Sequence, residues 1–260
     1  MTINGLCVCV GFAPLLARTL CAWQESLDDL VIVTTPDDRA TLDLCQHARV
    51  RVHMTRVFYE GGAAFNKGAA LEEARAAEYP PEGLKPSGGY AADWLLLFDA
   101  DVLPERGWRR VAECAVPGCI YGAHRYQAPI EGIDDRSPLR AWIDALCPTE
   151  DGLDGCPILG VLPDEVPGCF QLFHPSDPLI AQRTPVIPTD WSHAGDYDTE
   201  FCRLWPAERR VRLPIRLLHL GEPGTYWHGV APRDEAKQRI AAMHAERRRR
   251  GGWQHERLPS

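Results

Sequence analysis

The chain has 260 residues, of which 45% are hydrophobic and 25% are charged, and its formal net charge at pH 7 is −8. This length and composition suit one large globular α/β domain with a sizeable core and exclude an intrinsically disordered chain. The acidic balance argues against a nucleic-acid coat protein. A basic run at residues 247–250 is either a solvated helix end or a contact for an anionic acceptor.

The ten cysteines raise the question of redox compartment and metal binding. The sequence has no C-x-x-C pair, and most cysteines lie in apolar or helical stretches. We therefore expect these cysteines to be buried in the core as small hydrophobic residues. A zinc site built on Cys114 and Cys119, with Cys147 and Cys156 nearby, stays open as an alternative. Because no apolar run approaches ~18 residues and no signal peptide is recognisable, we expect a cytoplasmic protein without a membrane span.

The first ~110 residues alternate predicted strands with predicted helices. Apolar runs predict strands at residues 5–10, 30–35, 50–55 and 94–101, and helical patterns fall at residues 15–27, 40–48 and 64–77. Residues 79–90 are rich in proline and glycine and predict a surface insertion. This alternation predicts a parallel, doubly wound sheet with right-handed crossovers.

The second half of the chain is less regular. Residues 126–168 hold many prolines, glycines and acids around a short amphipathic piece at 139–146, which is typical of a substrate loop or lid. An aromatic strand is predicted after Gly168, a helix at 199–205, and a charged helix at 233–250.

The segment W-L-L-L-F-D-A-D at residues 94–101 is the most informative. A short continuous apolar run predicts an interior strand of a parallel sheet, which places Asp99 and Asp101 at its carboxyl end. Ligands collect at that edge of a sheet, and carboxylate oxygens suit Mg²⁺ or Mn²⁺, which can hold a diphosphate. Taken alone, the pair also fits an Asp-rich turn.

Four further segments carry candidate polar groups. A helix N-terminus, an amide and a lysine converge in F-N-K-G at residues 65–68, where they suit a phosphate or a ribose. Taken singly, such segments are more often turns or helix caps. The others are T-T-P-D-D-x-x-T at 34–41, G-C-F-Q-L-F-H at 168–174, and W-S-H-A-G-D-Y-D-T-E-F at 191–201 followed by H-L-G at 219–221 and Trp227.

Taken in this order, the motifs resemble those of the GT-A fold glycosyltransferases, particularly the family 2 type and the galactosyltransferase-like C-terminal module, over residues 5–230. The resemblance implies an α/β fold of the GT-A type, with a Rossmann-like, mostly parallel sheet flanked by helices and an acceptor-side loop region. It implies one domain over residues 1–260. Residues 1–110 would bind the nucleotide sugar, residues 111–230 would form the acceptor and catalytic half, and residues 231–260 would form a basic helix and tail.

The resemblance also implies roles for single positions. Asp38 would contact the nucleobase, Asn66 and Lys67 would line the ribose and phosphates, and His219 would complete a metal site. The positions that match the donor and metal site are Asp38, Asn66, Lys67, Asp99, Ala100, Asp101 and His219. The positions expected to contact the acceptor are Gly168, Phe170, Gln171 and Trp191.

The implied reaction is transfer of a sugar from a nucleotide sugar, most simply a UDP-sugar with Mn²⁺ or Mg²⁺, to an acceptor hydroxyl. A divalent ion stabilises the leaving diphosphate without proton transfer. If the reaction inverts, a carboxylate must also remove the acceptor proton. Asp198 is the expected base and Asp196 the alternative, and either also suits an N-cap of the following helix.

The acceptor is open between two classes. A saccharide could stack on Trp142, Trp191 or Trp227, whereas a hydroxymethylated base in DNA would have to be extruded from the duplex. The arginine run is compatible with DNA, but the net charge of −8 argues against it. A catalytically silent nucleotide-sugar or glycan-binding protein is the alternative function. A nucleotidyltransferase would need a glycine-rich phosphate loop, which G-F-A-P-L-L-A-R is not.

The chain departs from the family pattern in two places. Phe12, Ala13 and Pro14 replace the usual polar residue after the first strand, which weakens the expected hydrogen bonding to the nucleobase. Residues 227–230 lack the arginine that relatives often carry there, so Arg233 is an alternative phosphate contact.

Overall fold

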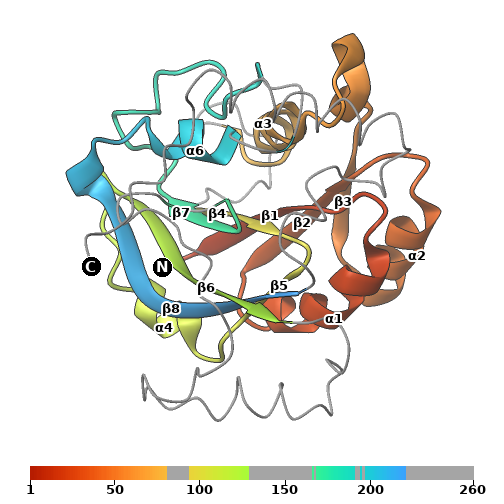
Figure 1. Ribbon diagram of the computed structural model, residues 1–260, viewed down its shortest axis with the longest axis horizontal. Coiled ribbons are helices and arrows are strands. Elements are labelled where there is room, and N and C mark those ends of the chain that lie inside the picture. The colour runs from red at the N-terminus through yellow and green to blue at the C-terminus, as the bar shows by residue number, and fades with distance from the viewer. Residues whose placement is uncertain (81–93, 129–165, 167, 191–193, 195–196, 221–260) are drawn as a thin grey trace, which may run out of the picture.

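The computed structural model describes residues 1–80, 94–128, 166, 168–190, 194 and 197–220. These residues form a mixed eight-stranded sheet with helices on both faces (Figure 1). The strands are β1 Ile3–Val8, β2 Asp29–Thr34, β3 Arg51–Met54, β4 Trp94–Asp99, β5 Val102–Pro104, β6 Ile120–Ala128, β7 Phe170–Phe173 and β8 Arg210–Leu220. The helices are α1 Ala13–Gln24, α2 Arg39–Ala48, α3 Lys67–Glu78, α4 Trp108–Ala112 and α6 Tyr197–Cys202, with 3-10 turns η1 Val57–Gly62 and η3 Ala207–Arg209.

The strand order is β3-β2-β1-β4-β7-β6-β8-β5. The first four strands of this order pair in parallel, which confirms the predicted α/β class and the parallel first half. The other half is mixed, because β7 runs antiparallel to β4 and β6, and β5 runs antiparallel to β8. Strands β6 and β5 were not predicted, and for β8 only a late strand before the H-L-G segment was expected, without bounds. In Figure 1, β8 is a long bent strand that reaches from β6 across to β5.

Each face of the sheet has its own apolar cluster. On one face, α1, α2 and α4 cover a cluster in which Trp23 packs 4.1 Å from Phe98 and 5.6 Å from Trp108, measured between ring centroids. On the other face, α3 and α6 cover a second cluster in which Phe173 lies 5.1 Å from Phe201. Burial of a single aromatic side chain stabilises the fold by about 1.5–3 kcal/mol, so the two clusters hold both helical layers firmly to the sheet.

Predicted and observed helix boundaries differ by a few residues, for identifiable reasons. Helix α1 begins at Ala13 because Pro14 is accepted in the first turn, where its missing N–H is not needed. Helix α3 begins at Lys67, after the Asn66 cap. Helix α6 begins at Tyr197, two residues before the predicted start, so Asp198 lies in its first turn and is not its N-cap.

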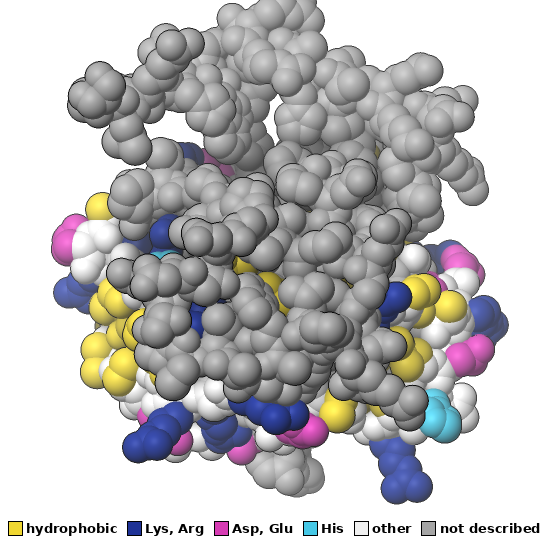
Figure 2. All heavy atoms as spheres, turned by 60° about the horizontal axis from the view of Figure 1, so that its bottom comes forward, with side chains coloured by type: hydrophobic (Ala, Val, Ile, Leu, Met, Phe, Trp, Pro, Cys, Tyr) yellow, Lys and Arg dark blue, Asp and Glu magenta, His cyan; other side chains and the backbone are white. Residues whose placement is uncertain are grey.

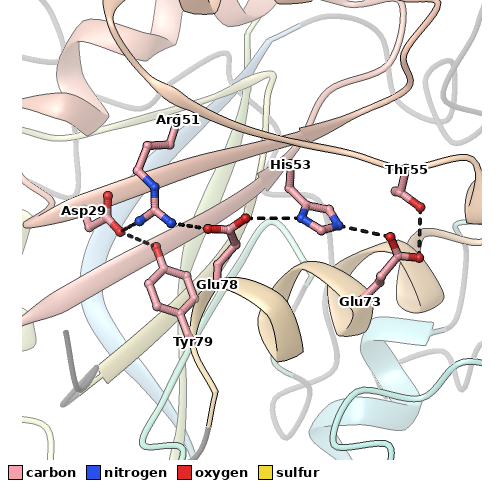
Figure 3. A network of polar contacts seen from close by, with 7 residues as sticks. All are labelled: Asp29, Arg51, His53, Thr55, Glu73, Glu78 and Tyr79. Atoms are coloured by element: carbon pink, nitrogen blue, oxygen red, sulfur yellow. Dashed lines mark hydrogen bonds and ion pairs between the residues drawn. The ribbon is translucent and has the colours of Figure 1, made fainter. Parts of the chain in front are cut away.

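A polar network fixes α3 to the edge strand β3 and to its neighbour β2 (Figure 3). The His53 ring lies between two carboxylates of α3, with its Nε2 3.1 Å from Glu73 and its Nδ1 3.3 Å from Glu78. The guanidinium of Arg51 pairs with both Glu78 and Asp29. Arg51 and Glu73 are exposed, and pairs that involve exposed side chains contribute about 0–1 kcal/mol each. Together they set the position of α3, whose first turn carries Lys67; the remaining members of the network are Thr55 and Tyr79.

The described surface is chemically mixed. On the face shown in Figure 2, dark-blue basic and magenta acidic side chains alternate along the lower rim of the described part. None of the helices that the structure describes combines the length and apolarity needed to cross a membrane. All eight described cysteines are free; Cys114 is exposed and Cys119 half-buried, whereas Cys147 and Cys156 lie outside the described residues. The segments 139–146 and 233–250, both predicted as helical, lie outside them too.

Candidate metal and catalytic site

Asp99, Asp101 and His219 meet at one end of the sheet. Their ligand atoms all lie within 4.8 Å of one another, and within the described ranges no other group of at least three such side chains does so. Asp99 ends β4, and β8 brings His219 beside Asp101, where its Nε2 lies 3.5 Å from Oδ2. The backbone fixes this approach, because the Leu220 N–H donates to the Asp101 carbonyl at 2.8 Å and Val102 pairs with His219.

The turn that carries the two aspartates is also held from the helical side. The Thr19 hydroxyl of α1 donates to the Ala100 carbonyl at 2.8 Å, and the Trp23 indole N–H donates to the Val102 carbonyl at 2.8 Å. Buried hydrogen bonds of this kind resist movement because each lost partner would leave an unsatisfied polar group. The carboxylates are therefore presented on a rigid support.

The electrostatics of the group suit a divalent cation. Burial, reinforced by the charge of Asp99, raises the pKa of Asp101 to about 7. Burial and the charge of Arg125 lower the pKa of His219 to about 4, so its imidazole is neutral at pH 7 and is able to donate a lone pair. Two hard carboxylates and one neutral imidazole, crowded and largely buried, fit Mn²⁺ or Mg²⁺ in donor type.

Lys67 links this group to the second half of the site. Its side chain is only 9% exposed, its Nζ forms an ion pair with Asp99, and it lies 5.2 Å from the centroid of the Tyr197 ring. Burial by itself would lower the pKa of Lys67, but Asp99, Tyr197 and Asp198 outweigh it and raise the pKa above its ordinary value. The ammonium thus stays charged between the aspartates and α6.

Asp198, the expected base, lies in the first turn of α6. Its Oδ2 accepts a hydrogen bond from the Gly168 N–H at 2.9 Å, and its Oδ1 accepts one from the Thr199 N–H at 3.0 Å. Desolvation raises its pKa against the opposing charge of Lys67. Asp198 as a residue is half-buried, and each of its carboxylate oxygens accepts one of these two hydrogen bonds.

Asp38 and Asn66 are engaged in capping. The Asp38 carboxylate accepts from the Gly11 N–H at 2.6 Å and from the Thr41 hydroxyl at 2.7 Å, which ties the end of β1 to the start of α2. Asn66 caps α3 by accepting from the Ala69 N–H at 2.9 Å. Its amide group donates to the Thr189 carbonyl at 2.7 Å. Both residues therefore shape the loops around the predicted nucleotide site.

Three predicted contact residues need correction. Phe170 is fully buried in the core, with ring centroids 5.4 Å from Trp108 and 6.4 Å from Trp23, so it presents no surface to an acceptor. Gln171 is also fully buried and donates to the Asp198 carbonyl at 2.9 Å, which makes it a support for α6. Ala100 is buried too, with its carbonyl occupied by Thr19. An aromatic strand between two apolar clusters favours the core over the surface.

Other expectations fall outside the described residues. These are Asp196, Trp142, Trp191, Trp227, Arg233 and the basic run at residues 247–250. The sequence analysis also missed two residues of the site. Tyr197 was hidden in D-Y-D-T-E-F between the two candidate bases, and Arg125 was missed because strand β6 was not predicted. Residues 120–128 read I-Y-G-A-H-R-Y-Q-A, without a regular polar and apolar alternation, so the local pattern held no signal for Arg125.

Comparison with known proteins finds matches among solved structures and none by sequence. No family model matches the chain, and no curated protein does. A solved structure of glucosyl-3-phosphoglycerate synthase from Mycobacterium tuberculosis with UDP matches at 13% identity and a TM-score of 0.47, covering 94% of this chain and 79% of that one. Its complex with Mn²⁺, UDP-glucose and phosphoglyceric acid matches at 16% identity and a TM-score of 0.47, with the same coverage.

A third structure is mannosyl-3-phosphoglycerate synthase from Rubrobacter xylanophilus, at 15% identity and a TM-score of 0.45, covering 100% of this chain and 78% of that one. At identities and TM-scores this low, what this chain does has to be argued from the residues of its own site.

Proposed function

We propose that this protein is a metal-dependent glycosyltransferase of the GT-A type, which transfers a sugar from a UDP-sugar to an acceptor hydroxyl. The observation that carries the proposal is the convergence of Asp99, Asp101 and His219 at the edge of the sheet, with Lys67 beside them. A nucleotide diphosphate leaving group needs cationic stabilisation, and this is the group of described residues that can supply it through an ion.

Asp99, Asp101 and His219 would hold the divalent ion, which when bound supplies charge stabilisation to the departing diphosphate. The neutral imidazole of His219 adds a ligand without adding charge. Lys67 keeps Asp99 in place through their ion pair and contributes a second positive charge close to the phosphates. These residues therefore act by binding and orienting the donor.

Asp198 would take the proton of the acceptor hydroxyl. A carboxylate of raised pKa binds a proton more readily than an ordinary aspartate, which suits a general base. The hydrogen bonds from Gly168 and Thr199 fix its orientation, and Lys67 favours its ionised form at rest. A base positioned opposite the leaving group corresponds to an inverting reaction. The acceptor belongs to one of the two classes considered above, a saccharide or a hydroxymethylated base in DNA.

Release of free UDP from a panel of UDP-sugars in the presence of Mn²⁺ tests the proposal. We expect release by the wild type, with and without hydroxymethylated DNA or saccharide acceptors, and its loss in Asp101→Ala and His219→Ala. His174→Ala is the matched control, since His174 bonds with Ser176 at 2.7 Å and lies outside the cluster. Binding of UDP without release from any sugar would favour a silent binding protein and contradict the enzyme.

A further inference from the structure

Arg125 lies on β6 beside the Asp99, Asp101 and His219 group. Strands β6 and β8 pair in parallel, with Arg125 opposite Leu217 and residue 127 opposite His219. Residues paired in register lie on the same face of a sheet, and residues two apart along a strand do so as well. Arg125 and His219 are therefore diagonal neighbours on one face.

The charge of Arg125 reaches the metal group. It lowers the pKa of His219, second only to burial, and it opposes the rise in the pKa of Asp101. The side chain is half-buried, and its Nε is buried and has no hydrogen-bond partner among the residues that the structure describes. A buried guanidinium donor without an acceptor is unfavourable, and an oxyanion bound beside it would satisfy this donor.

The neighbouring cations are already matched. Lys67 pairs with Asp99, and Arg216 has its Nε 3.7 Å from the Glu105 carboxylate. For Arg125, the described part of the chain provides no such carboxylate partner within ion-pair distance. A divalent ion held by Asp99 and Asp101 would use both carboxylate charges, including the one that faces Lys67. The charge of Arg125 is thus left for an anion that arrives with the substrate.

We propose that Arg125 binds an oxyanion of the substrate, a phosphate or carboxylate, next to the metal group. The planar fork of a guanidinium matches the paired oxygens of either group, which an ammonium does not. The inference rests on the proposed function and extends it. The oxyanion comes from one of two sources, the diphosphate of the donor or an anionic group on the acceptor.

Titration calorimetry on the full chain tests this with three probes. The probes are Mn²⁺ alone, UDP compared with uridine in the presence of Mn²⁺, and inorganic phosphate added to protein saturated with Mn²⁺ and UDP. The variants are Arg125→Gln and Arg125→Lys. The matched control is Arg110→Gln, an exposed arginine of α4.

Mn²⁺ should bind the variants at least as tightly as wild type, because Arg125 is not a ligand and its positive charge opposes the ion. A drop of about 10-fold or more in UDP affinity for Arg125→Gln, with uridine unchanged, assigns the oxyanion to the donor. Unchanged UDP binding with loss of phosphate binding to the loaded protein assigns it to the acceptor. Arg125→Lys should lie between Arg125→Gln and wild type, because it keeps the charge and loses the fork.

The inference is overturned if Arg125→Gln binds UDP and phosphate as tightly as wild type and Arg110→Gln do. If wild type binds neither Mn²⁺ nor UDP, the proposed function fails by itself. In that case the role of Arg125 is tested by phosphate binding to the metal-free protein. If wild type and Arg125→Gln bind phosphate equally, or if neither binds it, the inference is overturned. If Arg125→Gln does not fold, as judged by its thermal melt, Arg125→Lys carries the comparison.

Discussion

The backbone N–H of Gly168 donates to the Oδ2 of Asp198 across a distance of 2.9 Å, and no side chain fits at residue 168. A Cβ built there would lie 2.3 Å from that oxygen and 2.5 Å from the Asp198 Cβ. The segment before β7 and the first turn of α6 are thus fitted to each other around one carboxylate. Gln171 reinforces the contact by donating to the Asp198 carbonyl.

Gly168→Ala should therefore displace Asp198 and lower activity more than stability. Overpacking at such a contact costs about 1–3 kcal/mol in unfolding free energy. A base misplaced by about 1 Å loses on the order of 100-fold in rate. Urea unfolding and the rate of UDP release should be measured on the same preparation. Wild-type turnover in Gly168→Ala would show that the position of Asp198 is unimportant for the reaction.

Asp101→Asn should weaken Mn²⁺ binding by more than the 10–100-fold that loss of an outer-shell partner typically costs, since it removes a direct ligand. The same change should raise the melting temperature in EDTA, because it removes a buried charge that lies next to Asp99. Mn²⁺ affinity, from electron paramagnetic resonance of the free ion, and thermal melts provide the two measurements. His174→Ala should leave both unchanged, and a Mn²⁺ affinity unaffected by Asp101→Asn would remove Asp101 from the ligand set.

The parallel half of the sheet and the position of Asp99 and Asp101 could be predicted from the sequence, because a continuous apolar run is a strong local signal of a buried strand. The pairing of β6 with β8 could not be predicted from the sequence, because it depends on contacts between residues ~90 positions apart in the chain. Local pattern also cannot separate an acceptor contact from a core aromatic, and so Phe170 was misassigned. Arg125 became visible only when the register of β6 against β8 was known.

Lys67→Met should destabilise the metal-free protein by about 3 kcal/mol, because breaking a buried ion pair leaves Asp99 without its counter-charge. Asp198 would lose the same charge. Mn²⁺ should then raise the melting temperature of Lys67→Met more than that of wild type, since the ion replaces the missing positive charge.

Lys67→Arg separates charge from shape. It keeps the positive charge but places a larger group against Tyr197 and Asp99 in a site that leaves Lys67 only 9% exposed. We expect a stability between those of wild type and Lys67→Met. The same Mn²⁺-induced shift in all three proteins would argue against any electrostatic role of Lys67 toward the ion.

The acid sensitivity of the fold should depend in part on Asp28. Burial acts to raise its pKa, but the Ile3 N–H at 2.8 Å and the Arg109 guanidinium at 2.5 Å outweigh it, and the pKa falls below the ordinary 3.8. A depressed folded-state pKa means that the stabilisation is complete above 3.8 and is lost as the pH falls through the folded value. Asp28→Asn should therefore be less stable than wild type at pH 7, and the difference should shrink below pH 3.8.

Asp37→Asn is the control, because the Asp37 and Arg56 side chains are 72% and 66% exposed and such a pair contributes about 0–1 kcal/mol. A difference between Asp28→Asn and wild type that is constant from pH 7 to acid would show that the Arg109 contact is not linked to the charge of Asp28.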